Sequence, residues 1–325
     1  SHVYYVDSTV KAYDVNIFPN TGAEGRHPYG WGTIIVVGMR FGGGEYTVNI
    51  DGEAGARKLR SAYMIFDVTD PEDKPKLIAE ITDEDMGFTM AEPELVHFRQ
   101  GKDAGGFLGV GDLRRNDWYL VFGNGPTNLD KGISDKPAKL FYLNLKRVNE
   151  GLIPVTVSAS NGHVGGLRVV DWNGDYQDDQ LYISVVGDGT NGNLGSLRYA
   201  PLSANNEVGT VNPLLMQGVA PVNAPFSTPV LPVRNLETGD FWVFAGTGRL
   251  LVSDDLENAY QGFYYGIKVN QGEGGAFESV STSEMYDVTG HSLYEKTVFG
   301  LTVVTDARGV QLGTLEDFQQ NQIDI

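Results

Sequence analysis

Short runs of aromatic and β-branched residues that stop at glycine-rich turns recur along the chain. Such runs are typical of β-strands, because these side chains pack well on a pleated surface and glycine supplies the backbone freedom of tight turns. Helical spacing of apolar residues is confined to 253–262. The pattern therefore predicts an all-β fold. Four segments join one extended run to a second through a glycine turn, which predicts hairpins at 31–50, 117–128, 180–202 and 241–253.

The number and spacing of the strands indicate a β-propeller. Further strands are expected at 61–70, 139–145 and 263–270, and a long loop at 47–61. Radial repetition of four-stranded sheets leaves only short edges, and at about 40 to 50 residues per blade the 325 residues would form six or seven irregular blades. A pair of β-sandwiches is the alternative. No linker composition divides the chain, so we expect 1–325 to form a single β-propeller domain.

The composition excludes several classes of partner. The 42 acidic and 24 basic residues give a formal net charge of -18, which repels nucleic acids and anionic membrane surfaces. No run of about 18 apolar residues is present, so no direct membrane insertion is expected. The absence of cysteine excludes disulfides and thiolate metal sites. The chain opens without methionine, and we expect it to be a fragment of a larger protein.

One acidic segment between two apolar runs predicts a metal site. The side chains of Asp171, Asn173, Asp175 and Asp179 fall at loop positions 1, 3, 5 and 9, and the backbone carbonyl of Gln177 is available at position 7. Ca²⁺ takes six to eight oxygen ligands, and this oxygen spacing lets a tight loop wrap such an ion. Mg²⁺ fits less well because it prefers fewer protein ligands. The competing interpretation is a solvated acidic hairpin tip.

Details of this loop refine the prediction. Gly174 lets the backbone turn, and Tyr182 at position 12 replaces the acid of a helix-loop-helix calcium hand. A strand-loop-strand calcium site is therefore expected, with Asp178 pointing away from the ion.

Motifs of common enzymes are weak or absent. Residues 187–192 match a dinucleotide-binding glycine pattern, but an extended run follows where that motif needs a helix. No G-x-S-x-G nucleophile elbow is present. A glycosidase would need two acids that meet across the propeller axis, and nothing in the sequence pairs them. A quinone-cofactor dehydrogenase would hold its calcium in the central channel, whereas the acidic loop is expected to form a complete site within one hairpin. We therefore expect no enzyme activity. The scattered histidines are expected to be loop or packing residues: His2, His27, His97, His163 and His291.

A series of motifs around the acidic loop extends to about residue 270: SHVYYVDSTVKAYDV, WGTIIVVGMRFGGGEY, IFDVTDP, GFTMAEPELV, LVFGNG, NAPFSTPV, FWVFAGTGRLLVSDDL and FYYGIKV. In order and spacing these motifs resemble the C-terminal β-propeller domain of the PilY family. Members of this family are factors of type IV pilus biogenesis. The resemblance implies a secreted protein whose propeller binds one Ca²⁺ and modulates pilus extension, retraction and surface adhesion. The family's calcium ligands fall on Asp171, Asn173, Asp175, Asp179 and, through its carbonyl, Gln177.

The same resemblance implies location and partners. We expect the cell exterior of a Gram-negative type of cell, in association with the pilus, and pilus components or other cell-surface proteins as partners. No Arg-Gly-Asp tripeptide is present, the nearest being RGV at 308–310, so integrin-type adhesion is not expected. The alternative is a structural subunit that self-associates into a surface fibre or layer.

Overall fold

The fold is known from a computed structural model. Almost all regular structure is β-strand, which confirms the all-β prediction. The structure describes residues 4–49, 55–99, 116–187, 194–203, 207–216, 224–257, 262–269, 279–285, 294–298, 301–305 and 311–314. The helical pattern at 253–262 corresponds to the short helix α1 (Asp254–Glu257). Short 3-10 helices lie at η1 (Pro28–Gly30), η2 (Arg40–Gly42), η4 (Val148–Glu150) and η5 (Thr282–Glu284).

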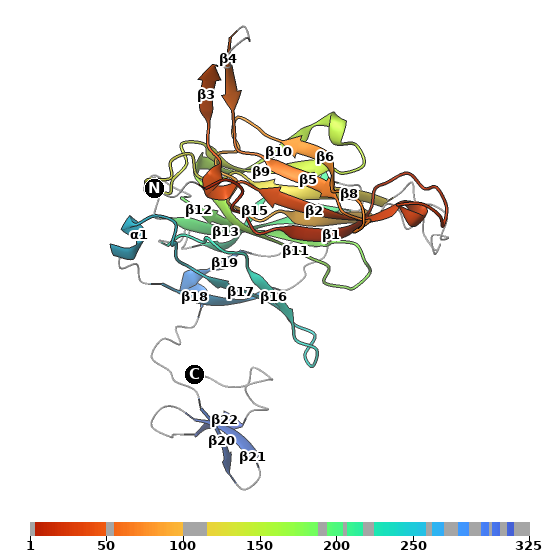
Figure 1. Ribbon diagram of the computed structural model, residues 1–325. Coiled ribbons are helices and arrows are strands. Elements are labelled where there is room, and N and C mark those ends of the chain that lie inside the picture. Colours follow the sequence, from red (N-terminus) through yellow and green to blue (C-terminus); the bar gives the residue numbers. More distant parts are fainter. Residues whose placement is uncertain are drawn as a thin grey trace.

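The first two sheets are four-stranded antiparallel meanders (Figure 1). The first has the order β1-β2-β5-β6, and the second has the order β10-β9-β8-β7. Their strands are β1 (Lys11–Asn16), β2 (Trp31–Gly38), β5 (Tyr63–Asp67), β6 (Lys76–Ile81), β7 (Glu94–Arg99), β8 (Asn116–Gly123), β9 (Pro137–Asn144) and β10 (Leu152–Asn161).

Three further sheets follow along the chain. The third has the order β11-β12-β13-β15-β19 with β14 paired to β13, and the others have the orders β16-β17-β18 and β20-β21-β22. Their strands are β11 (His163–Val170), β12 (Gln180–Val186), β13 (Gly195–Ser203), β14 (Glu207–Val208), β15 (Asn212–Met216), β16 (Leu231–Arg234), β17 (Phe241–Gly246), β18 (Tyr264–Val269), β19 (Val280–Ser281), β20 (Tyr294–Val298), β21 (Leu301–Thr305) and β22 (Gln311–Thr314). The number of six or seven blades stays a prediction.

Three apolar clusters join neighbouring sheets in pairs. One cluster packs the first sheet against the second through residues such as Ile34 and Leu120. Another joins the second to the third, and the last joins the third to the β16-β17-β18 sheet through Leu197 and Val243. Sheets that pack face to face in chain order are the arrangement of a propeller, because each blade buries its faces against the next.

Only some of the expected hairpins form. Segment 180–202 is confirmed, since β12 pairs with β13. The other three are wrong: β2 pairs with β1 and β5, β8 with β7 and β9, and β17 with β16 and β18. In two of these segments a glycine marks a close approach of backbone: a Cβ on Gly42 would lie 1.6 Å from the carbonyl oxygen of Tyr5, and one on Gly125 would lie 1.7 Å from that of Phe88.

The expected loop at 47–61 is also wrong. There β3 (Tyr46–Asn49) pairs with β4 (Ala56–Leu59), and this hairpin projects from the body of the molecule (Figure 1). Its alternating Tyr, Val and Leu residues fit a strand despite the turn-like residues between them. The expected strands 61–70, 139–145 and 263–270 are confirmed as β5, β9 and β18.

Candidate metal site

The acidic loop connects β11 to β12, which are neighbouring strands of the third sheet. The register pairs Val170 with Gln180, and the backbone N–H of Asp179 donates to the carbonyl of Val170 at 2.9 Å. The two strands thus close the loop at its base. All five predicted ligands therefore lie within one short connection between buried strands.

Asp171 organises the first half of the loop. Its Oδ1 accepts hydrogen bonds from the backbone N–H groups of Gly174 at 2.7 Å and Asp175 at 3.3 Å. Its Oδ2 accepts from the N–H of Tyr176 at 2.8 Å. Asn173 adds a similar turn, since its Oδ1 accepts from the N–H of Asp175 at 2.9 Å. These side chains fold the backbone tightly around themselves, as Asx turns do.

Asp179 ties the end of the loop to its beginning, and Asp175 holds the turn that follows it. Asp179 Oδ2 accepts from the backbone N–H groups of Trp172 at 2.7 Å and Asn173 at 3.3 Å. Asp175 Oδ1 accepts from the N–H of Gln177 at 3.0 Å. A carboxylate has about four lone-pair sites, so these contacts leave acceptor capacity for a cation.

Two left-handed residues make the compact path possible. Gly174 has φ +73°, a conformation that suits glycine. Tyr176 has φ 66°, which is strained for a residue with a Cβ, and its ring is 79% exposed. The expected turning role of Gly174 is confirmed.

Burial and neighbouring carboxylates disfavour the ionised form of Asp179 in this loop. Burial raises the pKa of Asp179, and the nearby carboxylates of Asp171 and Asp175 raise it further, against the backbone hydrogen bonds from Trp172 and Asn173. A bound cation would reverse this effect, because an opposite charge within a few ångströms favours the ionised carboxylate.

Asp178 points away from the loop centre toward the second sheet. Its Oδ2 accepts from the backbone N–H of His97 on β7 at 2.6 Å, and its own N–H donates to the His97 carbonyl at 3.2 Å. Burial raises the pKa of Asp178 to about 7, with contributions from Asp171, Asp179 and Glu94.

The structure adds His97, which the sequence placed only among loop or packing residues. Its Nδ1 lies 2.8 Å from the carbonyl oxygen of Tyr176, and its ring stacks on Trp118 with centroids 4.1 Å apart. The acidic loop is thereby attached to the edge strand of the neighbouring sheet. Nothing in the sequence pairs residues 97 and 178, because the contact depends on how two sheets pack.

The ligand set itself stays a prediction. In the part of the chain that the structure describes, no three His, Asp or Glu side chains are arranged to hold a metal ion. The loop fits calcium in its donor chemistry, which is all oxygen, and in the negative charge of its carboxylates. Of the dinucleotide-like pattern at 187–192, all but Gly187 lies outside the described residues. No described helix is long and apolar enough to cross a membrane.

Comparison with known proteins supports the expected resemblance. No family model matches the chain. The chain is 26% identical over 276 residues to a type IV pilus biogenesis factor PilY1 homolog from Xylella fastidiosa. The aligned region covers 83% of this chain and 18% of that protein. The crystal structure of the Pseudomonas aeruginosa PilY1 C-terminal domain matches with a TM-score of 0.56 and 18% identity, covering 95% of this chain and 61% of that one.

These matches confirm the resemblance to the PilY family and the propeller fold. The chain spans less than two thirds of the length of either relative. A GH43 enzyme from Xanthomonas citri complexed with xylose has a TM-score of only 0.30, which carries no argument for glycosidase activity.

Proposed function

We propose that this chain is a calcium-binding, non-enzymatic β-propeller that acts in type IV pilus biogenesis at the cell exterior. One observation carries the proposal: a loop of oxygen ligands in which neighbouring carboxylates raise the pKa of Asp179, in a propeller that resembles the PilY family. Its function is to control pilus extension, retraction and surface adhesion through contacts with pilus components or other cell-surface proteins.

Calcium would act on conformation. Asp171, Asn173, Asp175, Asp179 and the Gln177 carbonyl would hold the ion, whose double positive charge offsets the repulsion among the carboxylates. Because Tyr176 and Asp178 contact His97 on β7, an ordered loop also fixes the junction between the second and third sheets. Partners would meet a rigid surface when calcium is bound and a looser one without it.

Calorimetric titration with CaCl₂ tests the metal site. Wild-type protein should bind one Ca²⁺, and binding should disappear in Asp175→Ala. The matched control is Asp178→Ala, which removes a loop carboxylate that faces His97 and should keep its calcium affinity. Wild-type affinity in Asp175→Ala would exclude this loop as the site.

The pilus role needs its own test. Cells that carry Asp175→Ala in the full-length protein should assemble pili whose extension and retraction differ from those of wild type, whereas Asp178→Ala cells should retain calcium-dependent control. If Asp175→Ala abolishes calcium binding but the pili of these cells behave as in wild type, the regulatory role is contradicted. The assignment of the calcium site to this loop would still stand.

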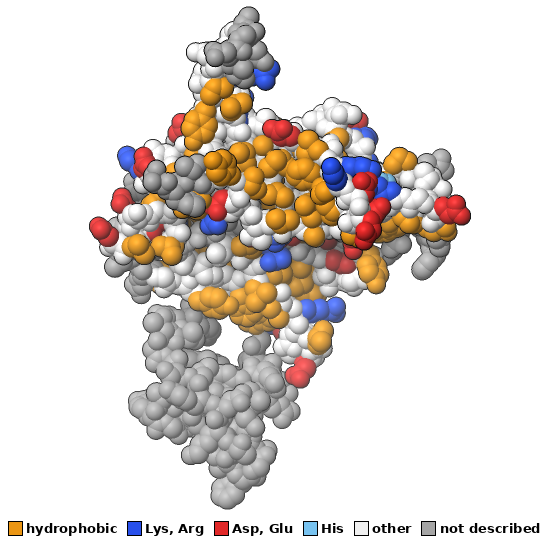
Figure 2. Space-filling view, in the orientation of Figure 1, with side chains coloured by type: hydrophobic (Ala, Val, Ile, Leu, Met, Phe, Trp, Pro, Cys, Tyr) orange, Lys and Arg blue, Asp and Glu red, His pale blue; other side chains and the backbone are white. Residues whose placement is uncertain are grey.

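Self-association into a fibre or layer is a second candidate, favoured by one surface. Apolar side chains gather over the β16-β17-β18 sheet (Figure 2), where Leu231, Val233 and Tyr264 are 58%, 38% and 72% exposed. Exposed apolar patches commonly mark interaction sites. Size-exclusion chromatography in calcium separates the candidates, because the pilus regulator should elute as a monomer and a fibre subunit should form oligomers that Tyr264→Ser weakens.

A further inference from the structure

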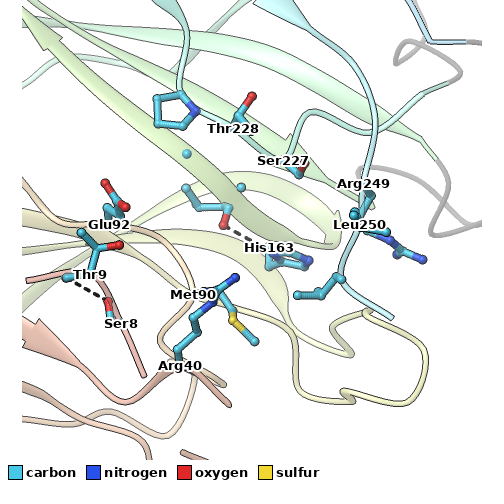
Figure 3. A pocket seen from close by; sticks show the side chains of 15 residues that line it. Ser8, Thr9, Arg40, Met90, Glu92, His163, Ser227, Thr228, Arg249 and Leu250 are labelled. Carbon is cyan, nitrogen blue, oxygen red and sulfur yellow. Dashed lines mark hydrogen bonds between the residues drawn. The ribbon is translucent and has the colours of Figure 1, made fainter. Parts of the chain in front are cut away.

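The first strands of four sheets begin around one cavity of about 370 Å³ (Figure 3). Residues just before β1, β7 and β16 and at the start of β11 line it, together with Arg40. Two of its charged groups are held in structural pairs, since Arg249 donates to Asp255 at 2.7 Å and Lys11 donates to Glu92 at 2.7 Å. The cavity therefore marks the place where four sheets meet.

Exposed aromatic residues gather at the opposite ends of the same strands. Trp31 begins β2 opposite Asn16, the last residue of β1, and is 46% exposed. Tyr29 lies two residues before Trp31 and is 54% exposed, and Tyr176 lies in the acidic loop that follows β11 and is 79% exposed. These three rings thus come from the first and third sheets.

A chain of contacts through the second sheet connects these rings. Trp31 meets Trp118 of β8 edge to face, with ring centroids 5.8 Å apart, and Trp118 stacks on His97 of β7 with centroids 4.1 Å apart. His97 Nδ1 donates to the carbonyl of Tyr176 at 2.8 Å. The residues form one row across three sheets, which we call the aromatic rim: Tyr29, Trp31, Trp118, His97 and Tyr176.

Both tyrosines of the aromatic rim have a left-handed backbone, with φ 54° at Tyr29 and 66° at Tyr176, which is unusual for a bulky residue. The N–H of Tyr29 donates to the Gly22 carbonyl at 2.7 Å, and its own carbonyl accepts from Asn16 Nδ2 at 3.0 Å. The backbone of Tyr176 is also held on both sides, as described for the acidic loop. Glycine or asparagine would adopt this conformation with less strain, so the fold does not explain the exposed rings. Strain of this kind is typical of binding sites.

The surroundings of the aromatic rim are negatively charged. Asp171, Asp175 and Asp179 lie in the loop that carries Tyr176, and one bound Ca²⁺ would offset only two of these three charges. The whole chain has a net charge of -18. The faces of aromatic rings are also negative, so exposed Tyr and Trp rings in a negative field attract the cations of Lys and Arg.

We propose that the aromatic rim docks a basic segment of a protein partner, whose Lys or Arg side chains stack on Tyr29, Trp31 and Tyr176. Tyr and Trp are the residue types most often found at the centres of protein interfaces, and a backbone that is already fixed lowers the entropy cost of binding. Because packed sheets lie about 10 Å apart, a row across three sheets spans about 20 Å, which suits a polypeptide better than a small molecule. Only the Tyr176 end rests on the proposed calcium function, since calcium would order the loop that carries it.

The probe is an acetylated heptapeptide amide of alternating glycine and arginine, whose extended length of about 23 Å matches the aromatic rim. A second peptide has citrulline in place of arginine, which keeps the shape and removes the charge. Titrated into the full chain in 150 mM NaCl, the arginine peptide should bind at least about fivefold more tightly than the citrulline peptide. Tyr29→Asn, Trp31→Thr and Tyr176→Asn should each weaken the binding of the arginine peptide by about two- to fivefold.

The matched control is Tyr46→Asn, because Tyr46 is 58% exposed on β3 and lies outside the aromatic rim. This variant should keep the affinity of wild type. Asparagine suits a left-handed backbone, so Tyr29→Asn and Tyr176→Asn should be at least as stable as wild type in thermal denaturation. A loss of binding in these two variants then reports the missing ring and not a damaged fold.

Calcium separates this proposal from the proposed function. The effects of Tyr29→Asn and Trp31→Thr should persist in EDTA, because neither residue lies in the acidic loop, so they test the aromatic rim even if the loop binds no metal. The effect of Tyr176→Asn should be larger in CaCl₂ than in EDTA.

Four results would each overturn the proposal. They are equal affinity for the arginine and citrulline peptides, unchanged affinity in folded Trp31→Thr, tighter binding of an aspartate peptide or of cellohexaose than of the arginine peptide, and oligomers of the chain that Trp31→Thr dissociates. The last two would assign the aromatic rim to an acidic partner or a saccharide, and to a second copy of the chain.

Discussion

The two ends of β11 carry structures of opposite construction. The acidic loop at the C-terminal end takes all its candidate ligands from 171–179, whereas the cavity at the N-terminal end is assembled from segments between residues 8 and 251. The loop is held by its own side chains and by backbone N–H groups a few residues away. The cavity exists only when four sheets have packed. One end is therefore a local structure and the other a product of the whole fold.

The glycines at the two ends show the same difference. A Cβ on Gly165 would lie 2.2 Å from the carbonyl oxygen of Phe226, and one on Gly166 would lie 2.3 Å from the backbone nitrogen of Pro229. A Cβ on Gly174 would meet nothing within 4 Å, but its φ is +73°. Glycine is required by packing at the cavity and by backbone conformation in the loop.

Gly165→Ala should have the largest effect. The added methyl group must displace the backbone of 226–227, which is fixed by neighbouring sheets, so the free energy of unfolding should fall by about 3 kcal/mol. Chemical denaturation measures this loss. Gly246→Ala is the control, since its backbone is not left-handed and a Cβ there would meet only Tyr264 Cδ2 at an ordinary 3.8 Å. A Gly165→Ala protein as stable as Gly246→Ala would show that the cavity end is loosely packed.

The titration of His163 should give the next effect. Burial lowers its pKa from 6.5 to about 4, and the charge of Arg249 lowers it slightly further, against backbone hydrogen bonds to Val164 and Gly132. A base whose pKa is lower in the folded state stabilises the fold above pH 6.5, and this stability is lost as the pH falls toward 4. The loss should be on the order of 3 kcal/mol.

The comparison with His163→Leu isolates this effect. Asp178 has the opposite sign, because its pKa is raised to about 7 and its contribution is present at low pH and lost as the pH rises. The titration of Asp178 contributes equally to the pH dependence of the unfolding free energy in wild type and in His163→Leu. The difference in unfolding free energy between the two, measured from pH 7.5 down to pH 4, should therefore report His163 alone. A flat difference would show that His163 is hydrated in the folded protein.

The same distinction explains what the sequence could predict. The calcium loop at 171–179 is predicted from spacing alone, because ligands of one loop are neighbours in sequence. Arg40, Thr89 and His163 have no such pattern, since their meeting depends on sheet packing. Strands were predicted from composition, but three of the four pairings were not, and in two of them the reason is that Gly42 and Gly125 serve close backbone contacts that resemble turn signals in the sequence.

Calcium should stabilise the protein by a moderate amount. Binding to the folded state alone contributes about 2.7 kcal/mol when free calcium is a hundredfold above its dissociation constant. Thermal denaturation in calcium and in EDTA should show this difference in wild type and in Arg40→Gln, but not in Asp179→Ala. Loss of the calcium effect in Arg40→Gln would mean that the two ends of β11 are coupled and would break the distinction drawn between them.

Gly174→Ala should have the smallest effect on the fold and a selective one on the loop. A methyl group there meets no atom, so the cost is only that of holding an L-residue in the left-handed region, about 1 kcal/mol in unfolding free energy. Because the turn at 174 brings Asp175 back toward Asp171, calcium affinity should also fall. Gly174→Asn is the matched variant, since asparagine tolerates this conformation better than alanine and should recover part of both losses. Denaturation in EDTA and calorimetric titration with CaCl₂ measure the two quantities separately. If Gly174→Ala destabilises the protein as much as Gly165→Ala, the loop is part of the cooperative core and is not the local structure that its hydrogen bonds indicate.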